Sequence, residues 1–312
     1  MDRFLRLLIL AATLLAFVVI VVGAYVRLSD AGLGCPDWPL CYGRPLPAEI
    51  ADAGAHAKAW KEMVHRYLAG TLGLLIVALA VAAWRSRRSR GIALAIVLLV
   101  VFQATLGMWT VTMLLKPAIV TAHLLGGMAT LALLVWLALS QWPHAPAPRL
   151  RGLRTAALLA LIVLAVQIAL GGWVSANYAA LACPELPLCR GALVPPMNFA
   201  DAFHVVRELG RTGEGELLPI EALTAIHWTH RLFALVALAA VLVAALRTLR
   251  VLRLFGVALA ALVVLQFGFG VANVALALPL PLAAAHNAGA TLLLVALVVL
   301  NFFAFRGLRP SW

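Results

Sequence analysis

The chain has 312 residues, of which 64% are hydrophobic and 12% are charged. Soluble domains average about 45–50% apolar and about 25% charged residues, so this composition excludes an ordinary water-soluble protein and indicates a membrane protein. The formal net charge of +12 is explained by basic residues that flank apolar spans, and no nucleic-acid partner is expected.

Eight apolar segments follow one another along the chain. Each has about the 20 residues that a helix needs to cross about 30 Å of hydrocarbon. The first segment continues through Tyr25 without a small-residue cleavage site, which predicts a retained helix rather than a signal peptide. The predicted fold class is an all-α membrane protein with these spans: 7–27, 66–84, 91–112, 118–139, 155–175, 223–246, 254–275 and 282–304.

Basic residues are distributed unequally between the segments that connect the spans on the two sides of the membrane. With eight spans both termini lie on one side of the membrane, together with 14 of the 24 basic residues and a single acid, Asp2. The opposite side carries 10 basic residues and 11 of the 12 acids. The positive-inside rule therefore predicts cytoplasmic N and C termini in the cytoplasmic (inner) membrane.

The sequence repeats itself. Residues 23–41 match residues 171–189 at an offset of 148, and both end in a Cys-Pro-x-x-Pro-Leu-Cys motif. His65-Arg66 matches His230-Arg231 at an offset of 165, and three further matches have an offset of 163: Gln103, Gly107 and His123 with Gln266, Gly270 and His286. We expect two tandem four-helix bundles (1–142 and 155–312) related by pseudo-two-fold symmetry, a cytoplasmic linker (143–154), and a longer outer loop around 190–222.

All four cysteines fall in the predicted outer loops. They form two pairs, Cys35 with Cys41 and Cys183 with Cys189, and two prolines between the members of each pair favour a tight turn. Disulfides persist outside the cytoplasm. The sequence predicts Cys35–Cys41 and Cys183–Cys189 disulfides. Free thiols or metal ligands are the alternatives, although zinc-binding cysteines usually lie two to four residues apart.

Four of the eight histidines form two repeat-related pairs: His65 with His123, and His230 with His286. Each is predicted near the outer end of a span, and His65 at the very start of its helix, so all four lie at similar depth. Polar residues inside spans are costly and usually functional. A histidine from each of two facing helices suits axial ligation of haem iron, with interfacial hydrogen bonding as the alternative. Three further histidines, His56, His144 and His204, are predicted to lie in loops and are expected to be solvated.

The segment from Gly23 to Cys41, the run Glu62-Met63-Val64-His65-Arg66, His123 and their second-half equivalents resemble the haem A synthase family over nearly the whole chain. This family oxidises the C8 methyl of haem O to a formyl group for cytochrome oxidase. The resemblance implies an oxidoreductase acting on CH or CH2 groups. It places the substrate haem O between His65 and His123, and a haem b cofactor between His230 and His286. A di-haem electron-transfer cytochrome and a haem carrier are the alternatives.

The two halves differ three residues before the paired histidine, where the first has Glu62 and the second has His227. Residues at i and i+3 share a helix face, so Glu62 is expected near the pocket of His65. With the resemblance we expect Glu62 to be catalytic, as a base or as a carboxylate that stabilises developing positive charge. The alternative is a surface carboxylate at a helix N-terminus, stabilised by the helix dipole. His227 is a rival to His230 as haem ligand.

Arg66 and Arg231 directly follow the paired histidines and are expected to bind haem propionates, because arginine binds carboxylates in bidentate fashion. Interfacial snorkelling is the alternative. An electron donor that no motif identifies, haem O synthase and a second copy of this chain are candidate partners, and membrane lipid surrounds the spans.

Overall fold

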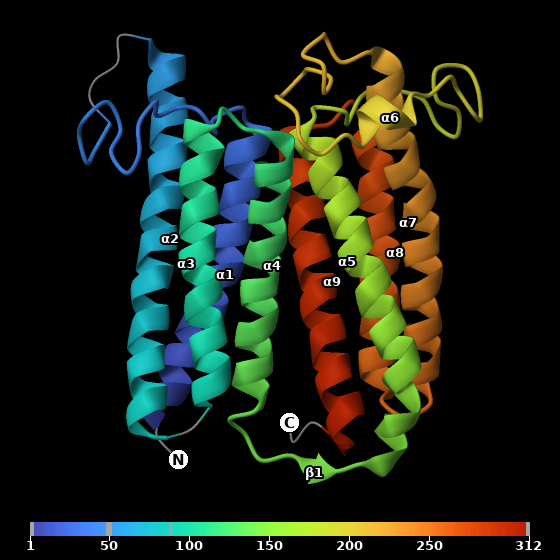
Figure 1. Cartoon of the computed structure of the whole chain (residues 1–312). Coiled ribbons are helices and arrows are strands. Elements are labelled where there is room, and N and C mark those ends of the chain that lie inside the picture. Colours follow the sequence, from blue (N-terminus) through green and yellow to red (C-terminus); the bar gives the residue numbers. More distant parts are fainter. Residues whose placement is uncertain (1–2, 48–51, 88, 310–312) are drawn as a thin grey trace. The chain divides into compact units, whose positions relative to one another are not determined.

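The computed structural model describes residues 3–47, 52–87 and 89–309 of the protein (Figure 1). Within these residues eight helices are long and apolar enough to cross a membrane, which confirms the eight predicted spans. They are α1 (Arg3–Leu28), α2 (Ala53–Arg85), α3 (Arg90–Thr112), α4 (Pro117–Leu139), α5 (Arg154–Ala176), α7 (Ile220–Leu249), α8 (Arg253–Ala275) and α9 (Leu280–Arg306).

The remaining elements are short. A 3-10 helix, η1 (Pro148–Leu153), leads into α5, and a single helical turn, α6 (Phe199–Ala202), lies in the long loop before α7. Strands β1 (Ala145–Pro146) and β2 (Leu308–Arg309) pair antiparallel. They tie the linker after α4 to the segment after α9.

Helix α2 begins much earlier than predicted. Its N-cap is Asp52, whose side chain accepts a hydrogen bond of 2.6 Å from the backbone N–H of Ala55. The helix has 33 residues, about 50 Å at 1.5 Å per residue, and therefore exceeds the hydrocarbon thickness. The expectations that His65 starts this helix and that His56 lies in a loop are both wrong, because the apolar run marks only the part of the helix within lipid.

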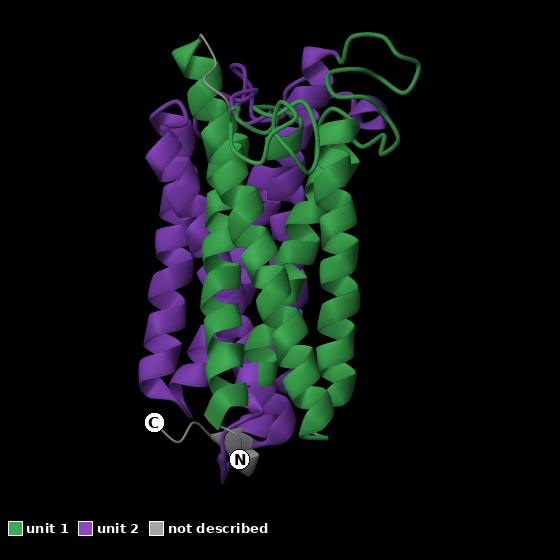
Figure 2. Cartoon of the chain, turned by 90° about the vertical axis from the view of Figure 1, so that its left-hand side faces the viewer, with its two compact units in different colours: residues 1–137, 175–177, 203–218 green, residues 138–174, 178–202, 219–312 purple. Residues whose placement is uncertain are grey.

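The chain forms two compact units (Figure 2). Unit 1 contains residues 1–137, 175–177 and 203–218, and unit 2 contains residues 138–174, 178–202 and 219–312. Two short segments from the second half of the sequence thus belong to unit 1. Arg27 holds the first of them by donating to the carbonyl of Ser175 at 2.8 Å.

Large apolar side chains are exposed along the spans. Leu14, Leu74 and Leu254 are exposed by 69%, 74% and 86%. Contact of such side chains with lipid tails has no free-energy cost, whereas their exposure to water would be unfavourable. The multi-pass membrane class that the composition predicted therefore agrees with the packing of the helices.

Candidate functional site

In unit 1, His65 on α2 and His123 on α4 come within electrostatic range of each other. Each imidazole packs against a glycine of a neighbouring helix. A Cβ at Gly23 of α1 would lie 2.7 Å from Cε1 of His65, and one at Gly107 of α3 would lie 3.3 Å from Cε1 of His123. A contact of 2.7 Å is shorter than real Cβ atoms make. Any residue larger than glycine at position 23 would therefore clash with the His65 ring in this orientation.

Unit 2 contains the equivalent arrangement. His230 on α7 and His286 on α9 are within electrostatic range. A Cβ at Gly171 of α5 would lie 3.0 Å from Cε1 of His230, and one at Gly270 of α8 would lie 3.3 Å from Cε1 of His286. Each half of the repeat therefore brings its two histidines together against two repeat-related glycines.

The four histidines are suited to bind haem iron. Each unit offers two imidazoles on separate helices, and haem iron takes such a pair as axial ligands. In the described part of the chain no group of three or more His, Cys, Asp or Glu residues could hold a bare metal ion. Two imidazoles on facing helices suit an iron whose other four ligands come from a macrocycle.

Both cysteine pairs form disulfides, as predicted: Cys35–Cys41 and Cys183–Cys189. Each disulfide loop is followed by a glycine with positive φ, Gly43 at +72° and Gly191 at +79°, a conformation that other residues rarely adopt. A carboxylate of the loop fixes this turn. Asp37 accepts from the backbone N–H of Gly43 at 2.8 Å, and the hydrogen bond lowers the pKa of the Asp37 carboxyl.

Glu62 and His227 have the same structural role in their units. Glu62 is 4% exposed, and its Oε2 accepts a hydrogen bond of 2.9 Å from the backbone N–H of Cys35. His227 is also 4% exposed, and its Nδ1 accepts from the backbone N–H of Cys183 at 3.2 Å. Each side chain therefore ties its disulfide loop to its long helix. The helix-terminus alternative for Glu62 is wrong, because Glu62 lies nine residues inside α2 and is buried.

The arginines after the paired histidines bind the same loops. Nη1 of Arg66 donates to the carbonyls of Asp37 at 2.9 Å and Leu40 at 2.7 Å, and its Nη2 donates to Oε1 of Glu62. The equivalent bonds of Arg231 go to the carbonyls of Glu185 and Leu188. The snorkelling alternative does not describe these arginines, since both guanidinium groups are held by protein carbonyls.

Three glutamines lie beside the histidines. The repeat marked Gln103 and Gln266, whose side chains pack so closely on Gly126 and Gly289 that a Cβ there would lie 1.8 Å and 2.2 Å away. Those glycines thus make room for glutamines. Gln167 was not among the predicted site residues, because the equivalent position in the first half is Val19 and the repeat does not mark it. An amide inside the apolar span 155–175 was the signal that could have found it.

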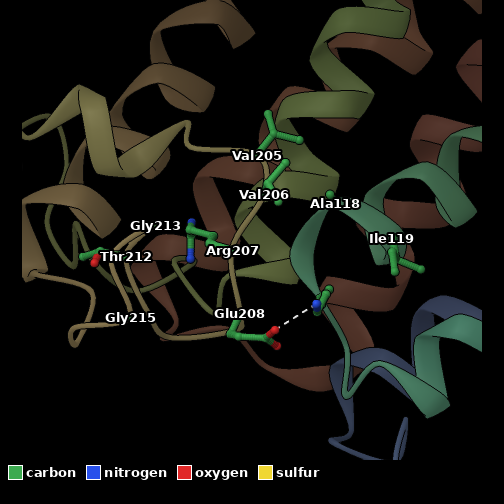
Figure 3. Close-up of a pocket in the computed structure, with 10 residues that line it drawn as sticks. Ala118, Ile119, Val205, Val206, Arg207, Glu208, Thr212, Gly213 and Gly215 are labelled. Atoms are coloured by element: carbon green, nitrogen blue, oxygen red, sulfur yellow. Dashed lines mark ion pairs between the residues drawn. The ribbon is translucent and has the colours of Figure 1, made fainter.

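The long loop of the second half contributes a pocket to unit 1 (Figure 3). Segment 203–218 encloses a pocket of about 340 Å³ with the start of α4. Nζ of Lys116 forms an ion pair of 2.8 Å with Glu208, the dashed line in Figure 3. Val205 and Val206 provide apolar walls. The sequence offset between repeat-related residues is 148 before this loop and 165 after it. The increase of 17 residues is about the length of segment 203–218.

Thiol chemistry tests the loops directly. We expect no cysteine to react with a thiol reagent in denatured protein until a reductant is added, because all four thiols are in disulfides. Closing loops this short stabilises each by about 2–3 kcal/mol at most. Mass spectrometry after labelling with and without reduction measures this. Four labelled thiols without reductant, in protein kept from reduction during preparation, would contradict the assignment.

Comparison with known proteins agrees with these features. The model of a family described as cytochrome oxidase assembly protein matches residues 6–298. A haem A synthase of Shewanella oneidensis is 41% identical over 304 residues, covering 91% of this chain and 92% of that protein. One from Methylobacterium sp. (strain 4-46) is 32% identical over 335 residues, covering 92% and 88%. One from Halalkalibacterium halodurans is 30% identical over 227 residues, covering 70% and 73%.

Proposed function

The chain belongs to the haem A synthase family of cytochrome oxidase assembly proteins, and from this premise we propose that its two histidine pairs divide the work of haem A synthesis. Substrate haem O binds between His65 and His123 in unit 1. Haem b binds between His230 and His286 in unit 2 and, when bound, supplies a redox centre that passes electrons. The reaction converts the C8 methyl of haem O to a formyl group through two successive hydroxylations, and the resulting diol loses water to give the aldehyde. The methyl carbon loses four electrons overall, which an oxidant such as O2 must take up.

The observation that carries this division of labour is the difference between positions 62 and 227. Both side chains accept from the first cysteine N–H of their loop. Loop anchoring therefore explains why an acceptor is present in both units, but it does not explain why only unit 1 has a carboxylate. A carboxylate can take a proton, or stabilise positive charge on the methyl carbon as it is oxidised. Glu62 is one helical turn from His65 on α2, and this spacing supports a role for Glu62 beside the proposed substrate site.

We also propose that Arg66 and Arg231 bind the propionates of the two haems. A guanidinium group has five N–H donors, and the loop carbonyls use only some of them. Each arginine follows a proposed iron ligand directly in sequence, at the end of the helix bundle that carries the disulfide loops. A propionate there would meet a cation whose position the loop already fixes.

We also propose that the protein lies in the cytoplasmic membrane with both termini inside and both disulfide loops outside, on the strength of the basic residues in the short gaps. If O2 supplies the hydroxyl oxygen, each hydroxylation also takes two electrons from a donor to reduce the second oxygen atom to water, and this electron donor is a further candidate partner. Haem O synthase, which would supply the substrate, and a second copy of the chain are candidate partners.

Extraction of bound and membrane haems tests the function. Cells that make haem O should accumulate haem A when they express this chain and should contain none without it, because the chain supplies the missing oxidation. Chromatography of acid-extracted haems measures the yield. Haem B and unreacted haem O alone, from well-folded purified protein, would favour a di-haem electron-transfer cytochrome over the enzyme. Bound haem that passes to an acceptor without oxidation would favour a carrier.

A further inference from the structure

We propose that unit 1 has a binding site for an anionic phospholipid between the start of α1 and the end of α2, where Arg85 binds the phosphate and an acyl chain lies against Phe4. The site is at the end of these helices away from the Cys35–Cys41 loop, about 30 Å along α2 from His65 at 1.5 Å per residue. It therefore lies outside the proposed haem sites and adds a function that they do not include.

The site is a groove of about 560 Å³, within the range of about 300–1,000 Å³ that is usual for ligand sites. Its residues on α2 are three, four and seven positions apart and so share one face of the helix: Ala78, Val81, Ala82 and Arg85. Phe4 of α1 adds a further apolar wall. Phe4 and Val81 are exposed by 60% and 46%. An acyl chain in the groove would give these side chains close apolar contacts.

The end of α2 lies at the depth of lipid head groups. The helix ends at Arg85, directly after Trp84, which is 60% exposed. The guanidinium of Arg90 lies 4.9 Å from the centre of the Trp84 ring and donates to the Trp84 carbonyl at 2.8 Å. Exposed tryptophan at the end of an apolar span is typical of the membrane–water interface. Arg85 is therefore at the level of the lipid phosphates, with the apolar part of the groove below it.

The charge at this end favours an anionic lipid. Within residues 3–47, 52–87 and 89–309, Arg85 forms no hydrogen bond or ion pair. Arg3, Arg6 and Arg87 add positive charge at the same ends of α1 and α2. A guanidinium group binds phosphate oxygens in bidentate fashion, and basic pockets between membrane helices bind anionic head groups. The groove and the unpaired cation thus match the two parts of one lipid molecule.

The second half of the repeat has the charge without the groove. At the offset of 165, Arg85 corresponds to Arg250, but the two alanines of the groove correspond to Val243 and Arg247. Larger side chains therefore stand at the positions where alanine leaves room in unit 1. Arg250 is the matched control, because it is the same basic residue at the equivalent end of its helix.

A lipid in this groove would join two helix ends that no loop connects. The chain links α1 to α2 only at the other end, through the Cys35–Cys41 loop. A lipid that contacts Phe4 and Arg85 together would hold the free ends next to each other. A ligand that binds only the folded state raises the unfolding temperature, so the bound lipid should stabilise the protein.

Native mass spectrometry of the purified full-length protein tests the proposal. Phosphatidylglycerol and phosphatidylcholine with identical acyl chains are titrated separately into the detergent solution. We expect phosphatidylglycerol to bind more tightly, and Arg85→Gln to weaken its binding about fivefold, the usual effect of one basic residue on anionic lipid. Ala78→Phe should also weaken it, because the new ring fills the groove while Arg85 stays in place. Inorganic phosphate alone should not displace the lipid, since it has no acyl chain.

Arg250→Gln removes the same charge outside the groove and should leave phosphatidylglycerol binding unchanged. Thermal unfolding gives a second measurement: the lipid should raise the unfolding temperature of the unsubstituted protein and of Arg250→Gln, but not that of Arg85→Gln. Equal losses of binding in Arg85→Gln and Arg250→Gln would overturn the proposal, because the lipid would then respond only to total charge. Equal binding of the two lipids by the unsubstituted protein, or displacement by inorganic phosphate, would overturn it as well.

Discussion

Glu62→His is expected to lower haem A formation by about 10²–10⁴-fold, the usual contribution of a general acid or base, while haem b stays in unit 2. The substitution copies the second half of the repeat, where His227 accepts from the backbone N–H of Cys183. It should therefore keep the loop anchored through Cys35 and remove the carboxylate together with its ion pair to Arg66, while Arg66 stays bound to the carbonyls of Asp37 and Leu40. Chromatography of extracted haems should show haem O or a partly oxidised haem in place of haem A.

Two controls separate chemistry from loop anchoring. Glu62→Gln also keeps an acceptor for Cys35 but no charge, and it should lose haem A formation to a similar extent. Glu62→Ala removes the acceptor as well, and it should in addition make the Cys35–Cys41 disulfide more easily reduced. Near-normal haem A from Glu62→His and Glu62→Gln, with a loss only in Glu62→Ala, would show that Glu62 serves the loop rather than the reaction.

Removal of either histidine of unit 2 should abolish the haem b signal. In His230→Ala or His286→Ala the iron loses one of its two axial ligands, and the remaining one-sided site should not retain haem through purification. The measurement is the reduced-minus-oxidised spectrum of purified protein, normalised to protein concentration. A full signal in both variants would refute the assignment of these ligands.

His227→Ala is the matched control, because His227 is one turn from His230 on the same helix. Nδ1 of His227 already accepts from Cys183, so its loss should loosen the loop but leave haem b bound. If haem b were lost in His227→Ala and retained in His230→Ala, the two histidines would exchange roles.

The eight helices were predictable because their signal is local. A run of about 20 apolar residues can satisfy its backbone in lipid only as a helix, whatever its neighbours do. The histidine pairs were also predictable, since internal repetition matches His65 to His230 and His123 to His286. The family was predictable from the resemblance of the segment from Gly23 to Cys41 and its second-half equivalent. The repeat even marked Gly23, Gly107, Gly171 and Gly270, although not their purpose.

The start of α2 was not predictable from hydropathy. Asp52 caps this helix well before the apolar run begins, and residues beyond the hydrocarbon carry no apolar pattern to reveal them. Whether Glu62 lies at the end of α2 or inside it depends on where this helix begins. As a residue at a helix end it would have been a solvated carboxylate, whereas inside the helix it is buried and accepts the N–H of Cys35.

The sequence by itself determined the membrane class, the spans, the paired cysteines and the paired histidines, because each depends on composition, spacing or repetition along the chain. Only the tertiary structure decided what these residues touch. It placed glycines against imidazoles, loop carbonyls around Arg66 and Arg231, Gln167 beside His230, and segment 203–218 in unit 1. The physical reason is that hydrogen bonds and close packing join atoms from helices far apart in sequence, and no local pattern records which helix face a side chain meets.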